Sequence, residues 1–270
     1  MVFTIVEPIG KKVPVLVSIP HCGTDFPDDI RDMYVQEQID APDDTDWFLQ
    51  QLYDFVPQMG ITLIFANYSR WVIDLNRDPD SKPLYDDGRA ITGLTPDKTF
   101  FGKNIYQNTP PDAQEVQRRL TQYYHPYHSK IQEILAGFRE DFQHVLLYDA
   151  HSIRRRVPSI YASPFPDLIL GDNDQTSAHP ELIRTAWEIL SSGPYSPMHN
   201  TLFKGGQITR FFGQPQNGVH ALQLERSKDL YMDDSETHYH PERAAIMQNH
   251  LKSLFTSLIL TLEKLNHEGI

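Results

Sequence analysis

Apolar residues in this chain fall into short runs separated by segments that contain proline, glycine and polar residues. Runs of about four to eight apolar, often β-branched residues that end at turn-forming residues are typical of buried strands. The pattern therefore predicts strands at 13–19, 61–66, 71–75, 144–148 and 219–225.

Other segments place apolar residues three and four positions apart, which is the spacing of one helix face. This spacing predicts a helix at 46–55, one or two at 111–140, one near 180–191 and a long one at 241–267. Little periodicity is present at 78–111, a loop is expected at 167–174, and the segment 204–213 is rich in glycine. A loop as long as 79–111 usually has a function in a compact domain, and we expect it to close over a ligand.

Strands that alternate with helices favour an α/β fold with a mixed, mostly parallel sheet covered by helices on both faces. No internal repeat or linker divides the 270 residues, so a single domain over 1–270 is expected. No apolar run approaches the roughly 18–20 residues that span a bilayer, and the N-terminus lacks the pattern of a secretory signal. Because the single Cys22 cannot form an internal disulfide, we expect a reducing, cytoplasmic location.

The net charge narrows the choice of partners. A formal charge of −12 is unfavourable for a protein that neutralises nucleic-acid phosphates with concentrated Lys and Arg. An anionic small molecule would need a local basic pocket instead. The 12 histidines make metal or proton chemistry worth testing. The oligomeric state is not determined by these features.

Polar residues suited to chemistry follow four of the predicted strands. They are His21, Asn76 with Arg77, His151 and Glu225. In sheets of this class, ligands gather at the carboxyl ends of the strands, so these side chains are expected to share one edge.

His21 and His151 are candidates for two ligands of a catalytic zinc ion, which takes three protein ligands and leaves one position for water. The third ligand is expected to be a carboxylate. Asp46 is the first candidate. Asp43 and Asp44 from the same segment and Asp25 from the loop after His21 stay open. Asp149 either accepts the second imidazole N–H of His151 or caps a loop.

Glu225 ends an apolar strand, and a carboxylate at the mouth of a metal pocket can move a proton from water to a leaving nitrogen. A salt bridge to an arginine is the alternative. Arg70, Arg77 and Arg210 are the candidates for binding an anion, because a guanidinium grips a carboxylate through two hydrogen bonds. The arginine triple 154–156 stays open. A phosphate-loop motif and a serine-nucleophile elbow are absent from the sequence.

Six ordered blocks from about residue 13 to 235 resemble the N-formylglutamate amidohydrolases, also called N-formylglutamate deformylases. The blocks are SIPHCGTDFP, DTDWFLQQLYDF, YSRWVIDLNRDP, YDAHSIR, FKGGQITRFFG and GVHALQLERSKDLYM.

The resemblance implies metal-dependent hydrolysis of N-formyl-L-glutamate to formate and L-glutamate, the closing step of one route of histidine degradation. It implies a fold related to zinc carboxypeptidases and aspartoacylase, with about eight strands in a mixed sheet between helices. By that similarity His21 and His151 correspond to zinc ligands, Asn76 and Arg77 to the pair that holds a substrate carboxylate, and Glu225 to the base.

One position departs from the pattern of those relatives. They carry an HxxE motif, whereas Thr24 stands here, so the carboxylate ligand must come from elsewhere and another divalent metal than zinc is possible. The function expected from the sequence is a zinc-dependent amidohydrolase in which Arg77 and Asn76 hold one substrate carboxylate and Arg70 or Arg210 the other. The alternatives are a zinc deacylase or carboxypeptidase-like hydrolase of another N-acyl amino acid, and a non-catalytic protein that binds an acidic amino acid.

Overall fold

The computed structural model describes residues 1–80 and 92–268, and a sheet of seven strands forms the centre of this part of the chain. The strands are β1 (Phe3–Val6), β2 (Val15–Ile19), β3 (Thr62–Ala66), β4 (Val145–Ala150), β5 (Leu168–Gly171), β6 (Pro197–His199) and β7 (Val219–Arg226). Their order is β1-β3-β2-β4-β7-β5-β6. Only the β1–β3 and β5–β7 pairs are antiparallel. The expected mixed, mostly parallel sheet is confirmed, with seven described strands rather than about eight.

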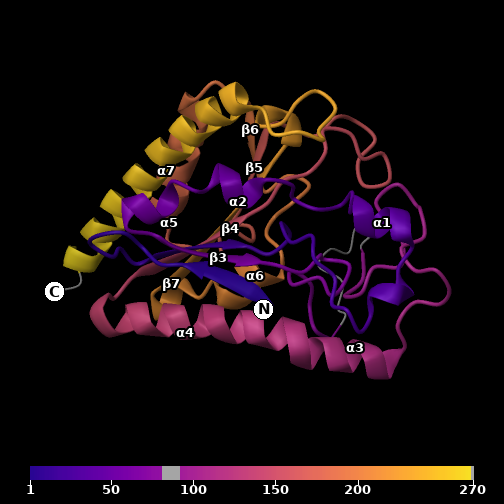
Figure 1. Cartoon of the computed structure of the whole chain (residues 1–270). Helices are drawn as coiled ribbons and strands as arrows, with labels where there is room; N and C mark the ends of the chain where they lie inside the picture. The colour runs from indigo at the N-terminus through magenta and orange to yellow at the C-terminus, as the bar shows by residue number, and fades with distance from the viewer. Residues whose placement is uncertain (81–91, 269–270) are drawn as a thin grey trace.

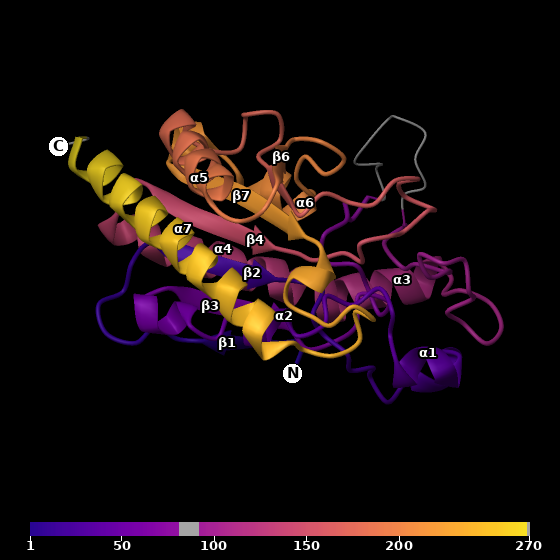
Figure 2. The ribbon, with the colours of Figure 1, turned by 90° about the horizontal axis from the view of Figure 1, so that it is seen from above.

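Helices cover both faces of this sheet (Figure 1). One face carries α2 (Leu49–Leu52), α5 (Pro180–Ser192) and the long α7 (Pro241–Glu268). The other carries α6 (Gln207–Phe212) and a long continuous helix of α3 (Ala113–Arg119), the π-helical turn Leu120–Tyr124 and α4 (His125–Asp141). Figure 2 shows that α1 (Gln36–Asp40) lies beyond one end of the sheet. No described helix has the length and apolarity needed to cross a membrane.

The inner strands are buried on both faces, which explains their continuous apolar runs. Successive side chains of a strand point to opposite faces. In β2, Val15, Val17 and Ile19 accordingly pack in the core below α5 and α7, whereas Leu16 packs in the core below α4. The strands expected at 13–19, 61–66, 144–148 and 219–225 are confirmed, as are the helices at 111–140, 180–191 and 241–267.

The prediction of a strand at 71–75 was wrong. All five of its residues are buried, but their backbone groups bond to side chains and loops rather than to a neighbouring strand. The carbonyl of Trp71 accepts from the Tyr34 hydroxyl, and that of Val72 accepts from Arg119. An apolar run signals burial, but it does not show where the backbone hydrogen bonds go.

Two further expectations need correction. The helix predicted at 46–55 shortens to α2, because Phe48 adopts a left-handed conformation with φ of 60° that interrupts a helix before Leu49. The expected loop 167–174 contains β5, and the pattern predicts neither β1 and β6 nor the helix α6. The loop expected to close over a ligand, 79–111, includes residues 81–91, which lie outside the described part of the chain.

The sheet topology decides where the functional candidates lie. Strands β2, β4 and β7 are neighbours and run parallel, so their carboxyl ends meet at the same edge. His21, His151 and Glu225 stand at these three ends. The edge therefore gathers two imidazoles and a carboxylate from parts of the chain about 200 residues apart.

A cluster of histidines at the opposite ends of β4 and β7 predicts acid sensitivity. His220 is buried, its Nδ1 accepts from the backbone N–H of His179, and its Nε2 lies 3.0 Å from Nδ1 of His144. Burial and then the neighbouring His144, His179 and Arg139 lower the pKa of His220 from 6.5 to about 3. Because the pKa is lower in the folded state, this contribution to stability is complete above pH 6.5 and declines as the pH falls toward 3.

Between pH 7 and pH 5, the free energy of unfolding of the wild type is expected to fall by about 2 kcal/mol more than that of the His220→Gln variant. The reason is that the variant has no imidazole to protonate at this position. Urea unfolding at the two pH values measures the difference. His267→Gln, which changes an exposed imidazole on α7, should behave like the wild type. An equal loss in the His220 variant and the wild type would contradict the assignment.

Candidate metal centre

The structure brings His21, Asp46 and His151 together in a group whose candidate ligand atoms all lie within 4.8 Å of one another. All three residues are buried. His21 follows β2, His151 follows β4, and Asp46 lies on the irregular segment before α2, where its N–H donates to the carbonyl of His21 at 2.9 Å. Two residues from strand ends and one from a loop thus form one cluster.

Each imidazole of this cluster is oriented by a second carboxylate. Nε2 of His21 lies 2.7 Å from Oδ1 of Asp74, and Nε2 of His151 lies 2.9 Å from Oδ2 of Asp149. Both rings therefore keep Nδ1 for a ligand, and Nδ1 of His151 lies 3.4 Å from Oδ2 of Asp46. Imidazoles that bind metals are commonly held in this way, because the acceptor fixes the tautomer and the ring orientation.

The carboxylate of Asp46 tests whether a cation fits. Oδ2 of Asp46 is buried and forms no hydrogen bond with a described residue, and its ion-pair contact is with Nδ1 of His151 at 3.4 Å. A buried carboxylate oxygen without a hydrogen bond is costly, and a cation among the three residues would compensate it. Two imidazoles and one carboxylate are the donor set of a catalytic zinc site and also suit other divalent ions. The residues present fit a metal ion.

The two imidazoles differ in their electrostatic surroundings. Burial, followed by the charge of Arg70, lowers the pKa of His21 to about 4, so that its ring is neutral near pH 7. Burial opposes protonation of His151 too, but the charge and hydrogen bond of Asp149 and the nearby carboxylate of Asp46 raise its pKa to about 10. Without a bound cation, the proton on His151 balances the surrounding carboxylates, and a metal ion would displace it.

Glu225 lies beside this cluster. The register of β4 and β7 places Ala150 opposite Leu224, so the residues that follow, His151 and Glu225, are neighbours across the two strands. Burial raises the pKa of Glu225 to about 7, against the opposing charge of His151. A carboxyl group near neutrality can both accept and release a proton.

Two of the three arginines expected to bind an anion, Arg70 and Arg77, contact Asp74. Arg70 donates to Asp74 at 2.6 Å, and its guanidinium lies 5.2 Å from the ring centroid of Phe100. Arg77 lies 3.8 Å from the same carboxylate and donates to the carbonyl and hydroxyl of Thr92 at 2.9 and 2.8 Å. Arg210 lies on α6, where its Nε donates to the carbonyl of Gly205 at 2.8 Å.

Asn76 connects the cluster to α6. Its amide oxygen accepts from the N–H of Ile208 at 2.8 Å. Its amide nitrogen donates to Oδ2 of Asp149 at 3.2 Å and lies 2.9 Å from Nε2 of His151. A Cβ atom added to Gly206 would lie 2.3 Å from the amide nitrogen of Asn76, so only glycine allows this approach. Asn76 therefore joins the carboxylate that orients His151 to the helix that carries Arg210.

The other candidate carboxylates lie outside the cluster. Asp44 accepts from Nε1 of Trp71 at 3.1 Å and from the N–H of Phe100, Asp43 pairs with Arg154, and Asp25 is exposed. Burial raises the pKa of Asp44 even though Arg70 opposes this. Asp46 is thus the aspartate that the fold brings to the two histidines.

Asp74 is the residue that sequence reasoning missed. It is fully buried, and its carboxylate contacts His21, Arg70, Arg77 and the N–H of Asn76. The available signal was its position in an otherwise apolar run, four residues after one arginine and three before another. That signal was hidden because the run was assigned to a strand.

Comparison with known proteins gives a consistent result over nearly the whole chain. The family model described as N-formylglutamate amidohydrolase matches residues 13–232. The chain is 40% identical over 251 residues to the N-formylglutamate deformylase of Pseudomonas aeruginosa, covering 92% of this chain and 93% of that protein. It is 39% identical over 251 residues to the N-formylglutamate deformylase of Pseudomonas putida, with the same coverage. Among solved structures, the N-formylglutamate amidohydrolase from Ralstonia eutropha JMP134 matches with a TM-score of 0.80 and 28% identity, covering 100% of this chain and 99% of that one.

Asp74→Asn is expected to lower the free energy of unfolding by about 3–5 kcal/mol even without metal, because it leaves the buried Arg70 without its counter-ion. Denaturant unfolding in the presence of a chelator measures the change. Glu133→Gln, which removes an exposed partner of Lys130, should change little. A loss below about 1 kcal/mol for Asp74→Asn would show that Asp74 does not hold this charge network together.

Proposed function

The chain belongs to the N-formylglutamate amidohydrolase family, and from that premise we propose that it hydrolyses N-formyl-L-glutamate to formate and L-glutamate. The observation that carries the proposal is the buried group of His21, Asp46 and His151 in a chain that is 40% identical to an N-formylglutamate deformylase. A reaction of this kind would serve histidine degradation, and we expect it to take place in the cytoplasm.

His21, Asp46 and His151 would hold a divalent metal ion, which we expect to be zinc. When bound, such an ion supplies a Lewis acid for the formyl carbonyl and lowers the pKa of water. The supporting features are the candidate ligand atoms within 4.8 Å of one another and the buried Oδ2 of Asp46, which forms no hydrogen bond with a described residue. Asp74 and Asp149 would keep the two imidazoles in the ligating orientation.

Glu225 would act as the general base and then as the general acid. It takes a proton from the attacking water while the water oxygen bonds to the formyl carbon. It returns that proton to the amide nitrogen as the carbon–nitrogen bond breaks. The second proton of the water passes from the new carboxyl group to the amine or to solvent, so that formate and glutamate leave and Glu225 is again ionised. Its position beside His151 at the end of β7 supports this role.

The substrate has two carboxylates, which gives a reason for more than one arginine at the site. Arg77 would hold one carboxylate, and Arg70 or Arg210 the other. A guanidinium carries five N–H donors, so Arg70 can bond to Asp74 and still donate to a ligand. Asn76 is expected from the sequence to hold a carboxylate together with Arg77, but its amide contacts Ile208, Asp149 and His151, so it would instead keep α6 in place beside the substrate.

The purified, metal-loaded protein is expected to release formate from N-formyl-L-glutamate and to lose this activity in chelator, because the carbonyl is then no longer polarised. A coupled formate assay with and without chelator, followed by zinc addition, measures this. N-acetyl-L-glutamate and peptide substrates should turn over much more slowly in a pocket shaped around a formyl hydrogen. Faster turnover of a larger acyl group would favour a different deacylase, and stoichiometric glutamate binding without hydrolysis would favour a binding protein.

Glu225→Gln is expected to lower kcat by about 100-fold or more with KM and metal content nearly unchanged, because it removes the proton carrier and keeps the side-chain size. Steady-state kinetics and metal analysis of the same preparation measure both quantities. Glu188→Gln, an exposed glutamate on α5, is the matched control. Retained kcat in a folded, metal-containing Glu225 variant would remove Glu225 from this role.

A further inference from the structure

Asp46 differs from the other members of the cluster because no strand holds it. It lies in residues 42–47, an irregular segment that we call the Asp46 loop. The position of a ligand on such a loop depends on contacts from other parts of the chain. One of these contacts is the bond from Asp46 N–H to the carbonyl of His21 at 2.9 Å.

Two cationic side chains bond to Asp43 in this loop. Nε of Arg154 donates to Oδ1 of Asp43 at 2.8 Å, and Nζ of Lys228 donates to the carbonyl of the same residue at 3.4 Å. Arg154 follows His151 by three residues, and Lys228 follows Glu225 by three residues. The loop is therefore tied to the segments that leave both functional strands.

The burial of the Lys228 ammonium group in this position is unfavourable for folding. It is 2% exposed, and it forms no ion pair within 4.0 Å with any described carboxylate. Burial lowers the pKa of its ammonium, although Asp46 and Asp43 act in the opposite direction. Its backbone N–H donates to the carbonyl of Ile153 at 2.9 Å, which joins it to the chain after His151 as well. Burying an ammonium group for one long hydrogen bond does not stabilise a fold efficiently.

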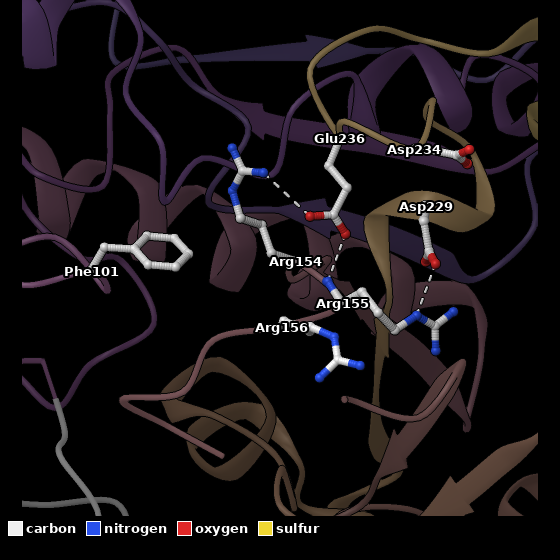
Figure 3. A pocket seen from close by; sticks show the side chains of 7 residues that line it. All are labelled: Phe101, Arg154, Arg155, Arg156, Asp229, Asp234 and Glu236. Atoms are coloured by element: carbon white, nitrogen blue, oxygen red, sulfur yellow. Dashed lines mark hydrogen bonds and ion pairs between the residues drawn. The ribbon is translucent and has the colours of Figure 1, made fainter. Parts of the chain in front are cut away.

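The side chain of Arg154 lines the pocket shown in Figure 3, which has a volume of about 420 Å³, and other residues of this pocket hold it in place. Glu236 accepts from NH1 of Arg154 at 3.3 Å and from the backbone N–H of Arg155 at 2.6 Å. Arg155 also donates to Asp229 at 2.9 Å. The guanidinium of Arg154 thus bonds both to Glu236 and to Asp43 of the Asp46 loop. The segment after His151, which carries Arg154, therefore helps to fix the position of that loop.

We propose that Lys228 and Arg154 are positioning residues that fix the Asp46 loop and thereby set the affinity of the cluster for its metal ion. The inference rests on the metal site of the proposed function. It assigns a role to part of the arginine triple 154–156, which the sequence left open, and to a buried lysine that the proposed reaction does not use.

The direction of the change in zinc affinity distinguishes a positioning role of these residues from a purely electrostatic one. Lys228→Met and Arg154→Gln each remove a positive charge near a cation site, and by charge alone they would tighten metal binding. Loss of positioning would weaken it. We expect the dissociation constant for zinc to rise about 10- to 100-fold in each variant, as for other residues that orient metal ligands.

Competition with a chromophoric chelator measures the zinc affinity of wild type and variants, and unfolding of the metal-free proteins measures their stability. Lys264→Met on α7 and Arg184→Gln, an exposed arginine on α5, are the matched controls and should keep wild-type affinity. A purely structural role would lower the stability of the metal-free variants without changing the zinc affinity of the folded protein.

Unchanged or tighter zinc binding in a folded Lys228→Met or Arg154→Gln protein would overturn the inference while leaving the proposed function intact. If Lys228→Met does not fold, Arg154→Gln decides, because the Arg154 side chain is 23% exposed and tolerates replacement more readily. Absence of zinc binding by the wild type would overturn this inference together with the metal site of the proposed function.

Discussion

The buried carboxylate of Asp74 is the interaction on which the arrangement of the candidate site depends. One oxygen contacts His21 and the N–H of Asn76, and the other binds Arg70. Burial alone would raise the pKa of Asp74, but Arg70 and then Arg77 and His21 keep it well below its usual range. An ionised carboxylate can occupy the core only with such partners. The imidazole on the metal side and the guanidinium on the proposed substrate side therefore share one anchor.

The second constraint is the direction of three neighbouring strands. Because β2, β4 and β7 run parallel, their carboxyl ends deliver His21, His151 and Glu225 to one edge of the sheet. These residues are held by strands that pack on both faces, so their backbones have little freedom. Asp46 has no such support. Its loop depends on bonds to the carbonyl of His21 and on charged groups from distant segments, and this is where positioning residues are needed.

The sequence predicted the inner sheet well, since strands buried on both faces give continuous apolar runs that are visible without any partner. The prediction failed at residues that are buried without belonging to a strand. Residues 71–75 are equally apolar, but their carbonyls bond to side chains such as Tyr34 and Arg119. Periodicity also missed β5, a short strand inside a segment rich in turn-forming residues. Hydrophobicity reports exclusion from water, and the hydrogen-bond partners that define a strand lie elsewhere in the chain.

By itself, the sequence determined the fold class, the strand ends at which His21, His151 and Glu225 stand, and the family to which the blocks belong. Each of these depends on local composition and order. Only the tertiary structure decided that Asp46, rather than Asp44 or Asp25, joins the two histidines, that both rings turn Nε2 toward a carboxylate, and that Asp74 binds Arg70 and Arg77. The reason is physical: neighbouring aspartates look alike along a chain, and they differ only in which distant donor, imidazole or guanidinium the fold brings within about 3 Å.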